Sequence, residues 1–389
     1  MRSFVFCLVL AGCAMAQIPR DVLFYQARTK MLENLENQPN YTCLETVERM
    51  RQAPGGASTV QDTLRLEVAL VNGKELFAWP GAKEFEDKDI DEIVSTGMFG
   101  NGNYGMYVRM IFGTGGLRFE SKGPTSLGGR MLERYDFAVK KEISGYWIRV
   151  QKSKALVGYH GSLFVDPANA DLRRLEVIAD DIPAELGLTA AEDRIDYARS
   201  VIGDEEFLLP VESALLMSGS DLVSRNHTRF SGCRKFSGES TLILDDAEFA
   251  EALVEAPEVK EVQLPADALL LLELRTALKP RAAAVGDSVE AKLISDVKRG
   301  KEKVVPKGAI ANGRILRLEI SRQGATLAIQ FYDLEWPGGH ADVKAVFERR
   351  AGLGVISMRT LNAEPGTFIL PEPLPPNLKG EVFYYRTVR

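Results

Sequence analysis

The chain has 389 residues, of which 45% are hydrophobic and 26% are charged, so it can form two domains with ordinary cores and is not a disordered chain. With a formal net charge of −6, nothing in the sequence suggests the basic face that a nucleic-acid-binding protein needs, and we expect no nucleic acid among its partners. The local basic run at residues 298–303 includes Glu302 and is predicted to be a polar hairpin tip.

Residues 1–16 have the parts of an export signal. Arg2 supplies a positive charge, residues 4–10 are apolar, and Ala14-Met15-Ala16 fits a small-residue cleavage site. The apolar run is far shorter than the roughly 20 residues that cross a bilayer, and we expect no transmembrane span elsewhere. The sequence therefore predicts an exported protein that is cut after Ala16. The resemblances given below imply that it is periplasmic or associated with the outer membrane.

A second processing route remains open at the same end of the chain. Residues 10–13, Leu-Ala-Gly-Cys, resemble the bacterial lipobox, in which a peptidase cuts before the cysteine and a lipid is attached to its thiol. That reading makes Cys13 a lipidation site. Against it, the folded part is predicted to begin near Asp21, without the usual flexible spacer.

Removal of the leader leaves two cysteines, Cys43 and Cys233. In an oxidising compartment an isolated pair favours a disulfide, and two buried thiols that never meet are the alternative. A bridge over so long a loop would restrict the unfolded chain by roughly 4–5 kcal/mol on the chain-entropy relation. We expect this bridge to join the first strand of the domain to the last and to pin an open seam between them.

The first predicted element is an amphipathic helix over residues 21–37. Strands follow over residues 41–50, 63–70 and 75–79, and in the first of these Glu45, Glu48 and Arg49 separate the apolar residues. From residue 117 to residue 244, short strands between turns predict a large antiparallel meander.

An insert interrupts this pattern between residues 85 and 112. Residues 87–94 are predicted to be helical, a glycine-rich segment follows, and residues 104–112 are rich in large apolar groups. Such an insert can fill or cover a concave sheet. Its aromatic and methionine side chains are the candidate ligand lining, with ordinary core packing as the alternative: Met98, Phe99, Tyr104, Met106, Tyr107, Met110 and Phe112.

An opening helix, a long meander and a helical insert together resemble the LolA/LppX-like fold of bacterial envelope carriers. Residues 163–167, Leu-Phe-Val-Asp-Pro, with residues 172–176 resemble a strand–turn–strand unit of that family, and residues 195–210 resemble its late strands. The resemblance covers residues 20–246. It implies an unclosed antiparallel half-barrel around an apolar cavity that holds acyl chains, with lipid or lipoprotein as the partner.

Residues 247–264 are acidic and are predicted to link this domain to a second one, residues 265–389. There the order Gly286-Asp287-Ser288-Val289-Glu290-Ala291, Pro306-Lys307-Gly308-Ala309, Gly313-Arg314 resembles the small β-barrel of TrbI-like periplasmic channel components. Pro306 suits a strand end, while Gly308 and Gly313 permit sharp turns or close backbone approach. The predicted fold class is therefore mainly β with a few helices, a LolA-like half-barrel followed by a small β-barrel.

The sequence contains no pattern that identifies a catalytic or metal site. The histidines His160, His227 and His340 have no neighbours at metal-ligand spacing, and no G-x-S-x-G elbow is present. Residues 100–105 fit G-x-G-x-x-G, but they follow a helix-like run and lack the surrounding βαβ unit. We expect no enzyme, no cofactor and no metal; a hydrolase would need a cleft with a perturbed catalytic group.

The function that the sequence favours is that of a non-enzymatic bacterial cell-envelope protein. Its first domain would bind lipid or lipoprotein acyl chains, and its second would dock other envelope proteins. The alternative is a structural or scaffold component with a solid first-domain core and partners on the C-terminal barrel.

Overall fold

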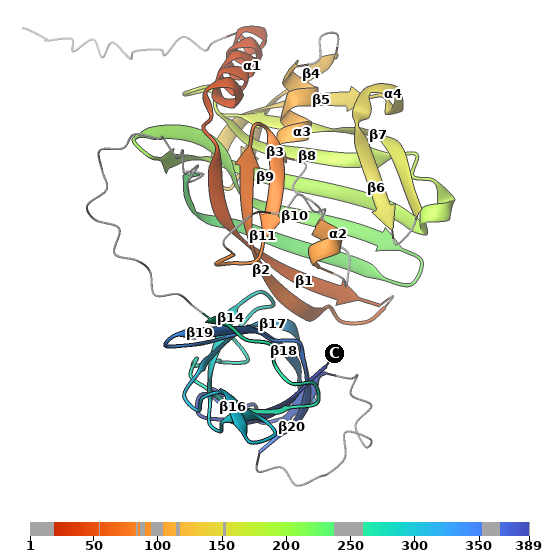
Figure 1. Cartoon of the computed structure of the whole chain (residues 1–389). Coiled ribbons are helices and arrows are strands. Elements are labelled where there is room, and N and C mark those ends of the chain that lie inside the picture. Colours follow the sequence, from red (N-terminus) through yellow and green to blue (C-terminus); the bar gives the residue numbers. More distant parts are fainter. Residues whose placement is uncertain are drawn as a thin grey trace, which may run out of the picture.

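The computed structural model describes residues 19–53, 55–82, 85, 90–94, 104–113, 117–150, 153–236, 260–351 and 366–388. Most of this chain lies in two large sheets, one of eleven strands and one of nine, with a separate two-stranded hairpin. The first sheet is open and strongly curved, and the second curls into a small barrel below it (Figure 1). The predicted fold class, mainly β with a half-barrel and a small barrel, is confirmed.

The eleven-stranded sheet has the strand order β3-β2-β1-β11-β10-β9-β8-β7-β5-β4, with β6 paired to β7. Its strands are β1 (Tyr41–Gln52), β2 (Thr59–Val71), β3 (Lys74–Ala78), β4 (Phe119–Leu127), β5 (Arg130–Val139), β6 (Tyr146–Val150), β7 (Ser153–Val165), β8 (Leu172–Asp180), β9 (Leu188–Ile202), β10 (Glu205–Gly219) and β11 (Val223–Lys235). Burial alternates along most of these strands, so one face packs inward while the other faces solvent.

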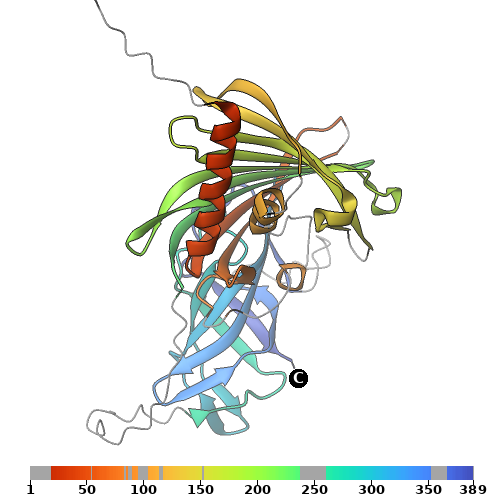
Figure 2. The same cartoon turned by 90° about the horizontal axis from the view of Figure 1, so that it is seen from above.

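Helix α1 (Arg20–Asn37) packs against the inner face of this sheet (Figure 2). Its buried residues Leu23, Phe24, Ala27 and Met31 recur at helical spacing, so they form one apolar stripe. The amide of Asn34 donates to the carbonyl of Leu208 at 3.0 Å and accepts from the backbone N–H of Leu208 at 2.7 Å. The predicted opening helix is therefore confirmed and firmly docked.

The remaining helical elements are short. They are α2 (Ile90–Ile93), α3 (Tyr104–Val108), the π-helical turn η1 (Arg109–Gly113) that continues α3, α4 (Lys141–Ser144) and the 3₁₀ turn η2 (Ala184–Leu186). No described helix combines the length and the apolar character needed to cross a membrane. The insert that carries α2, α3 and η1 connects β3 to β4, the two edge strands of the open sheet.

Cys43 and Cys233 form a disulfide, as predicted, with an S–S distance of 2.00 Å. The prediction that this bridge pins the open seam is wrong, because β1 and β11 are direct neighbours in the interior of the sheet. Their register shifts between Thr42 and Leu44, so the bridge lies at a β-bulge. The seam lies instead between β3 and β4, which the insert connects. The alternation of apolar and polar residues along a strand shows which side chains face the core. It does not show which other strands pair with that strand on its two sides.

The nine-stranded sheet has the order β12-β19-β18-β17-β14-β13-β22-β20, with β21 paired to β18. Its strands and those of the separate hairpin are β12 (Lys260–Glu261), β13 (Leu269–Leu274), β14 (Ser288–Leu293), β15 (Val297–Arg299), β16 (Glu302–Val305), β17 (Ile310–Ser321), β18 (Gly324–Trp336), β19 (Gly339–Asp342), β20 (Ala345–Arg350), β21 (Phe368–Pro371) and β22 (Val382–Thr387). The hairpin β15–β16 contains the basic run, as predicted.

Two glycines in this barrel have the roles that the sequence suggests. Gly308 lies in a turn with φ +99°, and a Cβ at Gly313 would lie 2.6 Å from the carbonyl oxygen of Gln330 on β18. Residues 260–261, the part of the predicted linker that forms β12, pair in parallel with β19. The TrbI-like resemblance and the division into domains at residues 247–264 remain predictions.

The two sheets meet at a joint between β2 and the segment before β14. The backbone N–H of Arg65 donates to the Val285 carbonyl, and the N–H of Val285 donates to the Thr63 carbonyl, both at 2.8 Å. The Arg65 guanidinium donates to both carboxylate oxygens of Asp287 at 2.6 Å. One apolar core runs from Leu64 and other residues of the half-barrel into the barrel. Hydrogen bonds, an ion pair and a continuous core therefore hold the sheets together.

Candidate functional site

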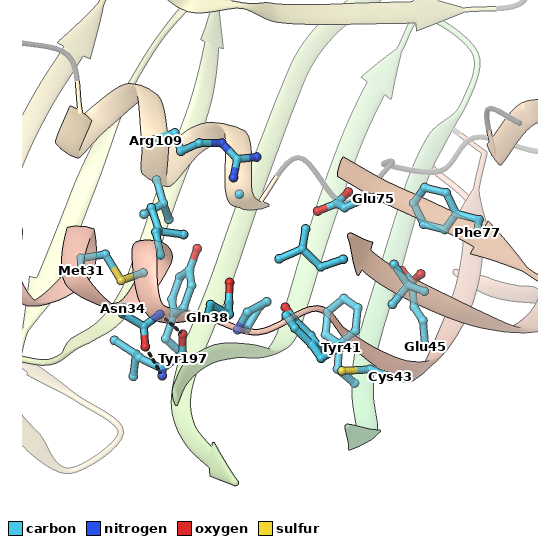
Figure 3. A pocket seen from close by; sticks show the side chains of 18 residues that line it. Met31, Asn34, Gln38, Tyr41, Cys43, Glu45, Glu75, Phe77, Arg109 and Tyr197 are labelled. Carbon is cyan, nitrogen blue, oxygen red and sulfur yellow. Dashed lines mark hydrogen bonds between the residues drawn. The ribbon is translucent and has the colours of Figure 1, made fainter. Parts of the chain in front are cut away.

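A cavity lies between α1, the inner face of β1, β2 and β3, and the α3–η1 segment (Figure 3). Its open volume is about 50 Å³, which accommodates about one or two water molecules. Small-molecule sites are usually about 300–1,000 Å³, so the cavity is small as it stands. Its wall is mostly apolar, and the polar side chains on it are Asn34, Gln38, Tyr41, Glu45, Glu75, Arg109 and Tyr197.

Strand geometry places the two carboxyls of this cavity. Tyr41, Cys43 and Glu45 alternate along β1, so all three point to the inner face. On β3, Glu75 and Phe77 do the same. Glu45, which the sequence places among the charged residues that separate the apolar ones, is itself buried, whereas Thr46 and Glu48 are more exposed.

Burial governs the electrostatics of the cavity. Glu45 is 2% exposed, and burial raises the pKa of its carboxyl to about 7. Burial, and then the neighbouring charge of Glu45, raise the pKa of Glu75 to about 8, while Arg109 acts in the opposite direction. Burial, with the charge of Glu75 as the smaller cause, also raises the pKa of the Tyr41 hydroxyl. Near neutral pH the cavity therefore carries less negative charge than two carboxylates would give it.

Two polar atoms on the cavity wall have no hydrogen-bond partner within the described part of the chain. They are Oε2 of Glu45 and the hydroxyl of Tyr197, a residue that is 4% exposed. Buried polar groups are nearly always hydrogen-bonded, so unsatisfied atoms beside an open space mark a place where another molecule can bind.

Arg109 supplies the positive charge at the rim of the cavity. Its side chain is exposed, and its guanidinium donates to the carbonyl oxygen of Gly73 at 2.9 Å. A Cβ at Gly73 or at Gly105 would lie 3.2 Å or 3.0 Å from that guanidinium. Because neither glycine has a side chain, the Arg109 guanidinium fits between the β2–β3 turn and α3.

The structure places the predicted ligand-lining residues in several environments. Tyr107 and Phe112 are fully buried, and the Tyr107 ring packs edge-on against Tyr146 and Tyr159 at centroid distances of 5.5 and 5.6 Å. Met110 packs half-buried against the same core. From this segment, Gly105, Val108 and Arg109 line the cavity instead. Met98, Phe99 and the side chains of Tyr104 and Met106 lie outside the described residues, and the lining remains a prediction.

Other titratable groups do not form a second centre in the described part. Burial raises the pKa of Asp193 to about 7, and its charge acts on Tyr107, on Tyr146 and on Tyr197, the last of which lines the cavity. Each histidine contacts a carboxylate: His160 with Asp180, His227 with Glu212, and His340 with Asp333. Within the described ranges, no three His, Cys, Asp or Glu side chains are grouped to hold a metal ion.

The buried carboxyls predict a pH-dependent stability. Folding raises the pKa of Glu75 from 4.5 to about 8 and that of Glu45 from 4.5 to about 7, so the folded state holds more protons within this window. The free energy of unfolding should therefore fall as the pH rises from about 5 to 8. Urea unfolding at a series of pH values measures this slope. Glu75→Gln should flatten it, and Glu120→Gln, which changes an exposed carboxyl, should leave it unchanged.

No protein family matches the chain by sequence, and no curated protein matches it. It is similar to the solved structure of a LolA superfamily protein from Nitrosomonas europaea, with 13% identity over 54% of this chain and 94% of the other, at a TM-score of 0.29. A putative outer membrane lipoprotein-sorting protein domain from Vibrio parahaemolyticus is 12% identical over 55% of this chain and 92% of its own, at a TM-score of 0.32.

A DUF1329 family protein from Desulfovibrio piger is 10% identical over 57% of this chain and 95% of its own, at a TM-score of 0.31. At these identities and TM-scores the three similarities support no inference about what this chain binds.

Proposed function

We propose that the protein is a non-enzymatic component of a bacterial cell envelope whose half-barrel holds the apolar chain of a lipid or lipoprotein. The observation that carries this proposal is the cavity between α1 and the inner face of β1–β3, whose wall is mostly apolar. The export signal predicted at residues 1–16 supports the location. The LolA-like resemblance of the sequence supports the class of partner.

Binding an acyl chain requires the cavity to widen. Helix α1 is held to the sheet by its buried stripe, by the Asn34–Leu208 pair and by the Tyr135 hydroxyl, which donates to the Arg20 carbonyl at 2.8 Å. The α3–η1 segment consists of two short turns. It contacts α1 through Arg28, whose Nε donates to the Phe112 carbonyl at 2.7 Å. In this proposal α3 and η1 shift away from α1 when an acyl chain enters.

A scaffold role is the second candidate, and one observation favours it. Much of the half-barrel interior is filled, because Tyr107, Tyr146 and Tyr159 pack together with the apolar residues of β5, β7, β8 and β9. The barrel exposes large apolar side chains at Leu316, Tyr332 and Val346, where partners could dock. A protein whose half-barrel interior is filled and whose partners bind the barrel would function without a ligand in the cavity.

Acyl-chain uptake by delipidated protein separates the two candidates. We expect the wild-type protein to bind palmitate in native mass spectrometry and in a fluorescent fatty-acid displacement assay. Val68→Trp fills the cavity and should weaken binding at least tenfold. Val60→Trp is the matched control, because Val60 lies on the same strand but is 47% exposed. Absence of uptake by the wild-type protein would reject lipid binding and leave the scaffold role.

A further inference from the structure

The hairpin formed by β6 and β7 extends beyond the strands beside it, at one side of the half-barrel (Figure 1). Strand β7 pairs with β5 over residues 159–165 and with β8 over residues 158–165. Among the described strands, residues 153–157 therefore pair with β6 alone. The turn of α4 packs on this hairpin, because the Ser144 hydroxyl donates to the Val157 carbonyl at 2.5 Å. Helix α4 and the hairpin together form a corner of defined shape.

The two faces of the β6–β7 hairpin differ in burial. Tyr146 and Ile148 point into the core of the half-barrel and are 6% and 5% exposed. Trp147 lies between them on the opposite face and is 52% exposed. Leu156 is directly opposite Trp147 on β7, so the two side chains share this outer face. The outer face of the hairpin is therefore partly apolar.

Trp147 differs from the other two tryptophans of the chain. Trp79 and Trp336 both pack against the apolar core that the two sheets share. Trp147 instead presents half of a large apolar ring to solvent. Tryptophan is enriched where one end of the side chain meets an apolar phase and the other meets water, as at protein interfaces and at membrane surfaces.

Cations surround this tryptophan. The Lys154 ammonium lies 5.3 Å from the centroid of the Trp147 ring, and Arg149 is directly opposite Lys154 in the hairpin. The described residues between 140 and 154 include four cations and one carboxylate, all exposed, and thus have a net charge of +3 in a chain of net charge −6. These five residues are Lys140, Lys141, Glu142, Arg149 and Lys154.

The combination of charge and apolar groups distinguishes this corner. Residues 298–303 of the β15–β16 hairpin also contain four cations and one carboxylate, but none of them is apolar. The corner adds Trp147 and, on α4, Ile143, which is 45% exposed. At a bilayer surface, indole rings lie at the level of the headgroups and Lys and Arg are attracted to anionic lipid. Stable protein interfaces usually bury about 1,200–2,000 Å², which favours a membrane over a protein for so narrow a hairpin.

We propose that the corner formed by α4 and the β6–β7 hairpin binds the surface of a membrane that contains anionic lipid. Trp147 enters the headgroup layer, and the cations beside it contact lipid phosphates. This inference goes beyond the proposed function, because the membrane contact lies outside the cavity and does not require the cavity to hold an acyl chain.

Co-sedimentation with vesicles tests the proposal on the chain that starts at Gln17, which excludes a lipid on Cys13. We expect binding to be at least about tenfold tighter with phosphatidylglycerol in phosphatidylcholine vesicles than with phosphatidylcholine alone, and to weaken as salt rises. Each cation near the surface contributes about fivefold, so Lys141→Gln with Lys154→Gln should weaken binding by at least about tenfold. Lys298→Gln with Lys301→Gln removes the same charge from the β15–β16 hairpin and should change the affinity less than about twofold.

The fluorescence of Trp147 gives a second measurement. Lipids with brominated acyl chains should quench the wild-type protein but not Trp147→Phe, because the two other tryptophans pack in the core. Trp147→Ala should weaken vesicle binding by at least about tenfold. Tyr25→Ala removes an aromatic ring that is 63% exposed on α1, and it should leave binding unchanged. Thermal unfolding of each variant shows whether the fold is retained.

No binding to anionic vesicles, equal losses in the two double lysine variants, or quenching that persists in Trp147→Phe would overturn the membrane site. A corner that serves a protein partner instead would give the first of these results. Val68→Trp, which fills the cavity, should leave vesicle binding unchanged. Vesicle binding without palmitate uptake would reject the lipid-holding half-barrel and retain the membrane site, so the two proposals fail separately.

Discussion

Replacing Gly286 with alanine should loosen the joint between the two sheets and lower the free energy of unfolding by about 4 kcal/mol. Gly286 has φ +100°, and a Cβ there would lie 2.2 Å from the carbonyl oxygen of Arg65 and 2.8 Å from the Trp79 ring. Neither neighbour can move freely, because Arg65 is bonded to Val285 and Trp79 packs against the shared core. Denaturant unfolding gives the energy, and small-angle scattering should show a larger radius of gyration.

Gly308 provides the matched control for this substitution. Its φ is +99°, but a Cβ there would meet no atom within 4 Å. Gly308→Ala should therefore cost only the strain of the left-handed backbone, about 1–2 kcal/mol, without a change in shape. Equal losses in the two variants, with an unchanged radius of gyration, would mean that close packing at Gly286 does not hold the sheets together.

Arg49→Met should lower the free energy of unfolding by about 3–5 kcal/mol. Arg49 is 1% exposed, and its Nε donates to Oδ1 of Asp62 at 2.6 Å while a second nitrogen donates to Oδ2. The substitution leaves the Asp62 carboxylate buried without this counter-charge. Urea unfolding at pH 7 measures the loss.

Two further variants distinguish the free-energy cost of leaving a buried charge unpaired from the net contribution of the ion pair to stability. Arg49→Met with Asp62→Leu replaces both charges by apolar groups and should recover most of the lost stability. Arg281→Met breaks an ion pair with Glu372 whose arginine is 66% exposed, and it should cost less than about 1 kcal/mol. A loss below about 1 kcal/mol in Arg49→Met alone would mean that the pair contributes no more than an exposed ion pair does.

The elements of the fold could be predicted from the sequence because each is set by local chemistry. The apolar stripe of α1 has helical spacing, and Leu64 and Leu66 alternate along β2 as a half-buried strand requires. The choice of partner strands could not be predicted in the same way. The position of β11 beside β1 depends on contacts about 190 residues apart in the chain, and no local pattern encodes them.

The candidate site was harder to predict than the fold. Glu45 and Arg49 lie on β1 among charged residues that look like its solvent side, yet both point inward with Cys43 and Val47. Side chains at every second position of a strand share one face, so counting from the buried Cys43 predicts that Glu45, Val47 and Arg49 also point inward. The large apolar residues of the insert favour it as the ligand lining, but Tyr107 and Phe112 are packed in the core.

The interior position of β1 also has a consequence for the order in which the protein can assemble. In a chain that emerges N-terminus first, as export would require, the hairpins of β1, β2 and β3 appear long before β11. Until then, one edge of β1 has unpaired backbone groups, which is the condition that favours pairing with a wrong strand. Contacts so distant in sequence also form slowly. The pairing of β1 with β11, and with it the Cys43–Cys233 bridge, must therefore wait until β11 has emerged.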